Sequence, residues 1–215
     1  MRIGVIRVVT TDDDAYLNAH GDLIRAEYGA DVDTVSRCIP GQPDGVHDDA
    51  TFARASVKVA DLAARMERED AVDALLISCA ADPGLARARE RVRVPVIGAG
   101  SAAARRALEL GERVGVLDLT PRTPESVASV LGDRRVAALV PEGVTRTHDL
   151  LGRAGVEASV RAAGRLVEMG AGTIMFACTG MSTIGLAAEL AGRIDVPVVD
   201  AVRAGAEAAL AAAAR

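Results

Sequence analysis

The sequence predicts an α/β protein of two similar lobes related by a pseudo-two-fold axis, each with a parallel four-stranded sheet flanked by helices. Strand-like apolar runs alternate with helix-like segments along the chain, as in parallel sheets covered by helices. A βαβα unit also occurs twice, over residues 71–108 and 170–210. In each unit an apolar run ends at a cysteine, and a later Val-Pro-Val strand leads into an Ala-rich helix. This repeat favours two lobes over one sheet of eight strands.

The first half of the chain supplies the elements of the first lobe. Residues 2–9, RIGVIRVV, are β-branched and apolar, which is typical of a buried strand. Thr10 to Asp14 offer hydroxyls and acids that suit a strand end and a helix N-cap. The pattern then predicts a helix over 15–28 closed by Gly29, a strand over 32–39, a loop over 40–45 and an amphipathic helix over 50–69.

The second half repeats the alternation. The pattern predicts a strand over 113–119, a turn over 120–124, a helix over 125–131, a strand over 135–140 and a helix over 156–169, with no clear assignment for 144–153. The final helix, 201–214, is expected to pack back on the first lobe. We therefore predict a first lobe of residues 1–98 plus 200–215 and a second of residues 99–199, both Rossmann-like (flavodoxin-like).

Composition limits the classes of function. The formal charge of −5 gives no electrostatic footprint for nucleic acid, and with 2% aromatic residues and no Trp there is no platform for stacking bases. The sequence contains no apolar run of 18 residues, so no membrane span is predicted. Residues 1–9 also lack the features of a signal peptide. Three cysteines fit a reducing compartment better than a disulfide scaffold, so we expect a cytoplasmic protein.

The two cysteines of the repeat, Cys79 and Cys178, are the candidate catalytic residues. Ligands of open parallel sheets bind beyond the carboxyl ends of the strands, where both thiols are predicted to lie. A helix beginning near each thiol is expected to lower its pKa. Two opposed thiols suit inversion at a carbon centre, because a thiolate takes a proton from one face while a thiol delivers one to the other. Such a reaction requires no metal or organic cofactor.

A simpler interpretation is that each cysteine is a small residue of the core, since free cysteine is often buried. Taken singly, that interpretation is the better one for either residue. Two thiols at equivalent positions of a repeated unit are much harder to explain by packing.

The residues around the cysteines resemble a known family. The segment CAADPGL at Cys79 followed by VPVIGAGSAA, and ACTGM at Cys178 followed by VPVVDAV, are similar to the two catalytic segments of hydantoin racemases. Those enzymes belong to the Asp/Glu racemase superfamily, and the resemblance covers essentially the whole chain. It implies two α/β lobes, a pocket between them, cofactor-independent racemisation with Cys79 and Cys178 as the two bases, and a homo-oligomer.

The first strand departs from that family. Hydantoin racemases have Asn-Pro-Asn and a hydroxyl residue where this chain has Arg7, Val8, Val9 and Thr10. An arginine there favours a substrate that carries a carboxylate, through a charge-assisted pair. The alternative is a structural arginine paired with an acid at the rim of the core. Ala80 and Ala81 replace residues that are often bulkier in the family, which changes the expected shape of the pocket.

Further substrate-binding candidates lie beside the thiols. Hydroxyl and backbone N–H groups there could hold a carboxylate or a ring carbonyl and stabilise the carbanion or enolate. The full set of predicted substrate-binding residues is Arg7, Thr10, Thr11, Ser78, Ala80, Thr179 and Gly180. The loop 36–45 could close over the cleft, although a simple surface turn is the better interpretation, and Cys38 is predicted to be a packing residue.

Other motifs are set aside. The histidines His20, His47 and His148 show no metal-ligand spacing and are predicted at the surface, and no metal site is expected. Gly98-Ala99-Gly100 resembles part of a dinucleotide-binding fingerprint, but the third glycine is missing.

The sequence is therefore compatible with three functions, each of which involves a small-molecule ligand. The first is a racemase or epimerase that inverts a carbon acid next to a carbonyl, such as a hydantoin, an amino acid or a related acid. The second is a maleate-type cis–trans isomerase or an arylmalonate-type decarboxylase of the same superfamily. The third is a non-catalytic binder, because function does not follow from fold.

Overall fold

The computed structural model describes all 215 residues and contains two four-stranded parallel sheets. The first sheet has the strand order β2-β1-β3-β4. Its strands are β1 (Arg2–Arg7), β2 (Asp33–Cys38), β3 (Ala74–Ser78) and β4 (Val96–Gly98). The helices of this half are α1 (Asp14–Tyr28), α2 (Asp49–Glu69), α3 (Leu85–Arg89) and α4 (Ala99–Leu110). The predicted strand 2–9 ends early, so residues 8 and 9 belong to the loop beyond it.

The second sheet repeats this topology with the order β6-β5-β7-β8. Its strands are β5 (Val114–Leu117), β6 (Arg135–Leu139), β7 (Thr173–Phe176) and β8 (Val198–Val199). The helices of the second half of the chain are α5 (Glu125–Leu131), α6 (Arg153–Glu168), α7 (Gly180–Thr183), α8 (Leu186–Leu190) and α9 (Ala201–Ala213), of which α9 packs on the first sheet. The segment without a predicted assignment contains a 3₁₀ turn, Thr147–Leu150. The predicted fold of two parallel four-stranded sheets flanked by helices is confirmed.

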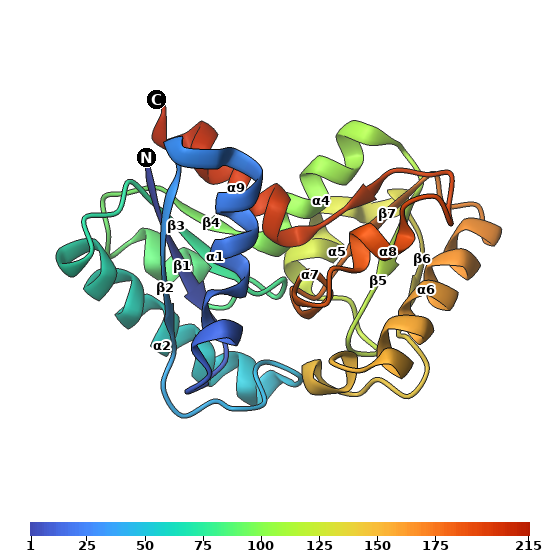
Figure 1. The fold of residues 1–215 in the computed structure, drawn as a ribbon, viewed down its shortest axis with the longest axis horizontal. Coiled ribbons are helices and arrows are strands. Elements are labelled where there is room, and N and C mark those ends of the chain that lie inside the picture. The colour runs from blue at the N-terminus through green and yellow to red at the C-terminus, as the bar shows by residue number, and fades with distance from the viewer.

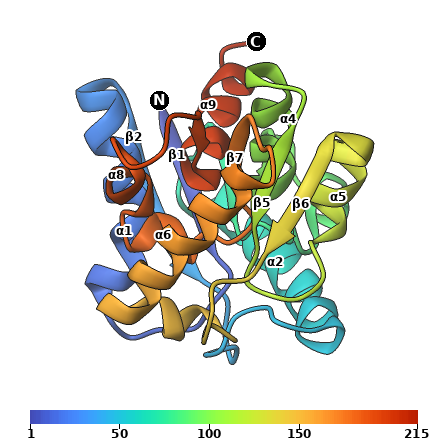
Figure 2. The same ribbon diagram turned by 90° about the vertical axis from the view of Figure 1, so that its right-hand side faces the viewer.

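Three apolar clusters arrange these elements in layers (Figure 1). The central cluster joins the facing sides of the two sheets through the Ala-rich helices α4 and α9, together with α1 and α5. One outer cluster packs α2 and α3 on the first sheet, and the other packs α6 and α8 on the second. Figure 2 shows α5 and α6 on opposite sides of the second sheet. Small alanine side chains let the central helices approach both sheets closely.

The alternation of side chains along a strand explains how one strand serves two clusters. In β3, Leu76 enters the central cluster, while Leu75 and Ile77 enter the outer one. Helix α9 contacts β3 and β4, so the end of the chain lies on the first sheet, as Figure 1 also shows. The exact division of the chain into lobes stays a prediction.

No helix has the length and apolar character needed to cross a membrane.

Candidate active site

A cavity of about 730 Å³ lies at the carboxyl ends of the strands. Residues of both halves line it, including the ends of β1 and β3 and the segment that follows β7. Both Cys79 and Cys178 are among the lining residues. The cavity is therefore placed where ligands of open parallel sheets bind.

Cys79 follows β3 directly and begins a tight loop. Its backbone N–H donates to the carbonyl of Ile77, and the loop then turns through Asp82, whose φ of 50° is unusual for a residue with a side chain. The Asp82 carboxylate accepts hydrogen bonds from the N–H groups of Gly100 (2.8 Å) and Ser101 (2.9 Å). These N–H groups belong to the first turn of α4, so the carboxylate fixes the loop to a helix start.

The glycines of the Gly98-Ala99-Gly100 segment make this contact possible. A Cβ at Gly98 would lie 2.2 Å from the Asp82 carboxylate, and one at Gly100 would lie 1.8 Å from the carbonyl oxygen of Ala80. The segment is therefore glycine-rich because the cysteine loop packs against it, which accounts for its partial likeness to a dinucleotide fingerprint.

The second cysteine has a corresponding support built the other way round. Ser182 in α7 donates a hydrogen bond of 2.8 Å to Asp200, which accepts from the N–H groups of Val202 and Arg203 at the start of α9. In the first unit the carboxylate comes from the cysteine loop, whereas in the second it comes from the residue after the Val-Pro-Val strand. Both cysteine segments are thus attached to the N-terminus of a central helix.

The environment of the thiols raises their pKa values. Burial, with a smaller contribution from the neighbouring Cys178, raises the pKa of Cys79 to about 12. Burial likewise raises the pKa of Cys178 to about 11, although the N–H groups of Gly180 and Met181 and the Thr147 side chain favour the thiolate. The expected lowering of the thiol pKa is therefore wrong. The helices that follow are only five (α3) and four (α7) residues long, too short for their dipoles to offset desolvation.

Asp118, at the end of β5, adds a negative charge near Cys178. Burial raises the pKa of Asp118 to about 6, while a hydrogen bond of 2.5 Å from the Thr123 hydroxyl opposes that rise. Its Oδ1 atom is buried without a hydrogen-bond partner. The Coulombic effect of this carboxylate contributes to the raised pKa of Cys178.

His20 connects the two halves beside the cavity. It is buried in α1, with Nδ1 2.7 Å from the Ser78 hydroxyl and Nε2 2.8 Å from the Thr183 hydroxyl. The prediction of a surface position is wrong for His20, because the helical face that carries it packs against the second half. Burial, with Arg7 nearby, lowers its pKa well below the usual value, so the ring is neutral. The predicted surface position is confirmed for His47, which is exposed at the rim of the cavity, and for His148.

Among the predicted substrate-binding residues, Arg7, Ser78, Ala80, Thr179 and Gly180 line the cavity with the two cysteines. The lining includes neither Thr10 nor Thr11. The Thr10 hydroxyl donates to the carbonyl of Ile39 (2.6 Å) and accepts from the N–H of Gln42 (2.7 Å). Thr10 therefore holds the loop after β2, because the chain has left the strand at Arg7.

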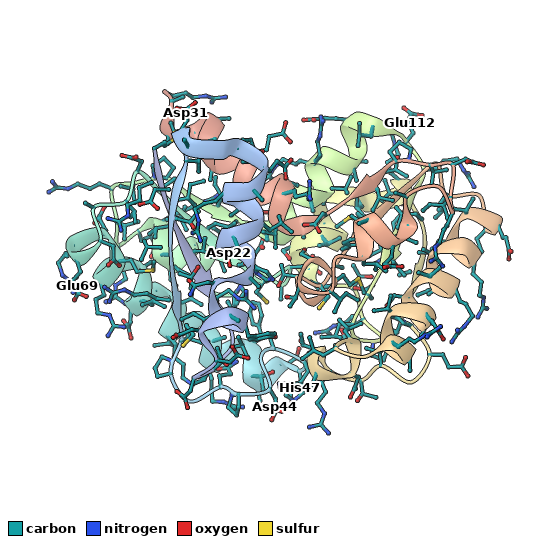
Figure 3. The ribbon with its side chains drawn as sticks, in the orientation of Figure 1. Asp22, Asp31, Asp44, His47, Glu69 and Glu112 are labelled. Carbon is teal, nitrogen blue, oxygen red and sulfur yellow. The ribbon has the colours of Figure 1, made fainter.

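The loop 36–45 approaches the cavity only at its end. Gly45 lines the cavity, together with residues 46–49 that lead into α2. Asp44 and His47 lie at the foot of the molecule, where this loop approaches the second half (Figure 3). Asp44 lies 3.6 Å from Arg146 of that half.

Sequence reasoning missed Tyr16, His20, Asp118 and Thr147 around the site. The positions of Tyr16, His20 and Thr147 depend on how α1 and the 3₁₀ turn pack across the two halves, and no local pattern marks these three residues. The position of Asp118 directly after a buried strand was the one available signal. No group of three or more His, Cys, Asp and Glu side chains is arranged to hold a metal ion.

Comparison with known proteins places this geometry in context. Residues 3–209 match the family model described as Asp/Glu/Hydantoin racemase. A hydantoin racemase of Paenarthrobacter aurescens is 33% identical over 147 residues, which cover 65% of this chain and 61% of that protein. The chain thus matches about three fifths of the length of this curated relative.

Solved structures are similar to this one over nearly the whole chain. An allantoin racemase from Klebsiella pneumoniae has a TM-score of 0.87 and 28% identity, covering 100% of this chain and 88% of that one. A variant of arylmalonate decarboxylase has a TM-score of 0.71 and 18% identity, covering 99% of this chain and 92% of that one. At that identity the second likeness concerns the fold alone.

Proposed function

Because this chain belongs to the Asp/Glu/hydantoin racemase family, we propose that it is a racemase whose Cys79 and Cys178 invert a carbon acid centre next to a carbonyl. The observation that carries the proposal is the presence of both thiols in the lining of one cavity, each after a strand of a different sheet. Hydantoins, allantoin, amino acids and related acids form the substrate class. The protein is expected to act in the cytoplasm as a homo-oligomer.

The chemistry follows from two cysteines of which one is a thiolate while the other is a neutral thiol. The thiolate removes the proton from Cα on one face, which leaves a carbanion or enolate and a neutral thiol. The second thiol then donates its proton to the opposite face and becomes the thiolate. Two thiolates repel each other, and the effect of Cys178 on the pKa of Cys79 supports a single shared charge. Protons balance over the cycle, so the reaction consumes no cofactor.

The raised pKa values suit this role. A thiolate desolvated in the cavity is a stronger base towards a weak carbon acid than an ordinary thiolate. Its population at neutral pH is low, so the rate should increase with pH. Cys178 has three groups that favour its thiolate, whereas Cys79 has only the N–H of Ala81, and we infer that Cys178 ionises first.

Neighbouring groups are positioned to hold the substrate. The backbone of Ala80 and Gly180 lies beside the thiols. The Thr179 hydroxyl donates a hydrogen bond of 3.1 Å to the carbonyl of Ser78, which joins the two halves. We assign the N–H groups of the cysteine segments to the developing enolate oxygen. Ser78 is assigned a positioning role through His20, since its hydroxyl is 2.7 Å from the ring.

The test is a panel of hydantoins, allantoin, amino acids and dicarboxylic acids in heavy water, followed by proton NMR and chiral chromatography. The proposal predicts loss of the α-proton signal together with inversion for at least one compound. Cis–trans isomerisation of maleate with a covalent cysteine adduct would instead indicate the isomerase. Release of CO₂ from an arylmalonate would indicate the decarboxylase, and ligand-induced stabilisation without turnover would indicate a binder.

A further inference from the structure

We infer that Arg7 is a specificity-determining residue whose guanidinium binds a carboxylate of the substrate, so that the compounds inverted by this protein are anionic carbon acids. This inference rests on the proposed function, because it assigns the substrate class of the same cavity. It comes from one feature of the structure: a buried cation at the cavity without a counter-ion.

Arg7 is almost completely buried. Its side chain is 2% exposed, yet it is one of the residues that line the cavity. Arginine remains charged in proteins, and although burial lowers the pKa of Arg7, that shift does not neutralise it. Removal of a charge from water is costly unless hydrogen bonds and an opposite charge compensate it.

The chain itself supports the charge of Arg7 only through the side chains of Tyr16 and Cys38, and no carboxylate pairs with it. None of its ion pairs includes Arg7, and the Nη1 atom is buried without a hydrogen-bond partner. The closest support is the Tyr16 ring, whose centroid lies 5.0 Å from the guanidinium carbon. This ring can hold the guanidinium plane in place, but it brings no negative charge.

The acids of the cavity are engaged elsewhere. Asp48 caps α2 by accepting from the N–H of Thr51, Asp49 pairs with Arg122 at 2.6 Å, and Asp82 accepts from two N–H groups of α4. The remaining one, Glu125, is exposed to solvent. A structural arginine paired with an acid at the rim of the core is therefore not what the structure contains.

Arg7 is also close to the reacting groups. The parallel register pairs it with Ser78, the residue before Cys79, on the neighbouring strand. A carboxylate bound by Arg7 would lie next to the first thiol, where it anchors one end of the substrate while Cα lies between the sulfur atoms. The positive charge of a buried guanidinium also stabilises the negative charge that develops as the carbanion forms.

The experiment compares anions with matched neutral amides by isothermal titration calorimetry. The pairs are hydantoin-5-acetate with hydantoin-5-acetamide, and N-carbamoyl-alanine with N-carbamoyl-alaninamide. The first pair places the carboxylate beyond the ring and the second places it on the stereocentre. The inference predicts that the wild type binds at least one anion about 30-fold more tightly than its amide, as expected for a buried charge pair.

The variants are Arg7→Met, which removes the charge at similar length, and Arg37→Met as the matched control on β2. Arg37 already pairs with Glu69 and Asp70 and does not line the cavity. Arg7→Met should abolish the preference for the anion and leave amide binding within about threefold, while Arg37→Met should keep the preference. In thermal unfolding without ligand, Arg7→Met should be at least as stable as the wild type, because an uncompensated buried charge has been removed.

The outcomes separate the inference from the proposed function. If neither anion binds more tightly than its amide, or if Arg7→Met weakens both partners equally and lowers the melting temperature, the inference is overturned and Arg7 is structural. If the anion binds through Arg7 but no compound loses its α-proton in heavy water, the inference stands and the racemase proposal fails.

Discussion

The reactivity of the two cavity thiols towards iodoacetamide should reveal their raised pKa values. Only the thiolate reacts, so the rate depends on its population and on its intrinsic nucleophilicity. At pH 8 a thiol with a pKa of about 8.5 is roughly one quarter ionised. Cys178 and Cys79, with pKa values of about 11 and about 12, would be ionised to only about 10⁻³ and 10⁻⁴.

The higher basicity of such thiolates partly offsets this. With a Brønsted coefficient of about 0.45, each additional pKa unit increases nucleophilicity about threefold. The net expectation at pH 8 is alkylation about 20-fold slower for Cys178 and about 60-fold slower for Cys79 than for an ordinary thiol. Both alkylation rates should also increase about tenfold per pH unit from pH 7 to pH 10 without levelling off, because the pH stays below the pKa of both thiols over this range.

Peptide mass spectrometry after timed alkylation gives each rate separately. Cys38 in the same digest and the urea-unfolded chain serve as references. The slope against pH is independent of how easily the reagent enters the cavity, whereas the absolute rate is not. A plateau below about pH 9 for either cavity cysteine would refute the argument, since it would mean that hydrogen bonds outweigh desolvation.

Three further predictions concern the surrounding structure. Asp118→Asn should raise the free energy of unfolding at pH 7 to 8 by up to about 3 kcal/mol. The folded pKa of Asp118, about 6, exceeds its unfolded value, so this carboxyl stabilises the fold only at low pH and loses that contribution as the pH rises through 6. Urea unfolding at pH 4 and pH 7.5 checks this, and an equal effect of the substitution at both pH values would contradict it. Gly100→Ala should cost about 1–3 kcal/mol and reduce kcat, because its Cβ would meet the carbonyl of Ala80, whereas Gly164→Ala, with nothing within 4 Å, should be neutral or stabilising. His20→Ala should cost about 2–4 kcal/mol in urea unfolding, since it leaves two hydroxyl groups without a partner and opens a cavity; a cost below about 0.5 kcal/mol would show that the bridge between the halves is unimportant.

The alternation of strands and helices was predictable because its signals are local. Apolar β-branched runs end at polar or glycine-containing turns, and they recur in the same order twice. The repeat then placed the two cysteine segments at equivalent strand ends, and both line the cavity. The sequence predicts that the strand containing Arg7 continues to residue 9, but it ends at Arg7. The chain beyond it is held by the hydrogen bond from the Thr10 hydroxyl to the carbonyl of Ile39.

The rest of the site depends on packing between segments distant in the chain. His20 contacts Ser78 and Thr183 only because α1 lies against both halves, and a helical pattern does not reveal that partner. The pKa values of the thiols also escaped prediction, since they depend on the balance between burial and a few N–H donors. A sequence indicates the donors through the small residues, but it does not indicate how completely the cavity removes water.

The most direct test of the two-thiol account is solvent deuterium exchange of each separate enantiomer of a turned-over substrate by Cys79→Ser and Cys178→Ser. The account predicts that neither variant inverts the substrate, while each exchanges the α-proton of one enantiomer only, and the two variants choose opposite enantiomers. Inversion by either variant at a rate near that of the wild type would contradict the account.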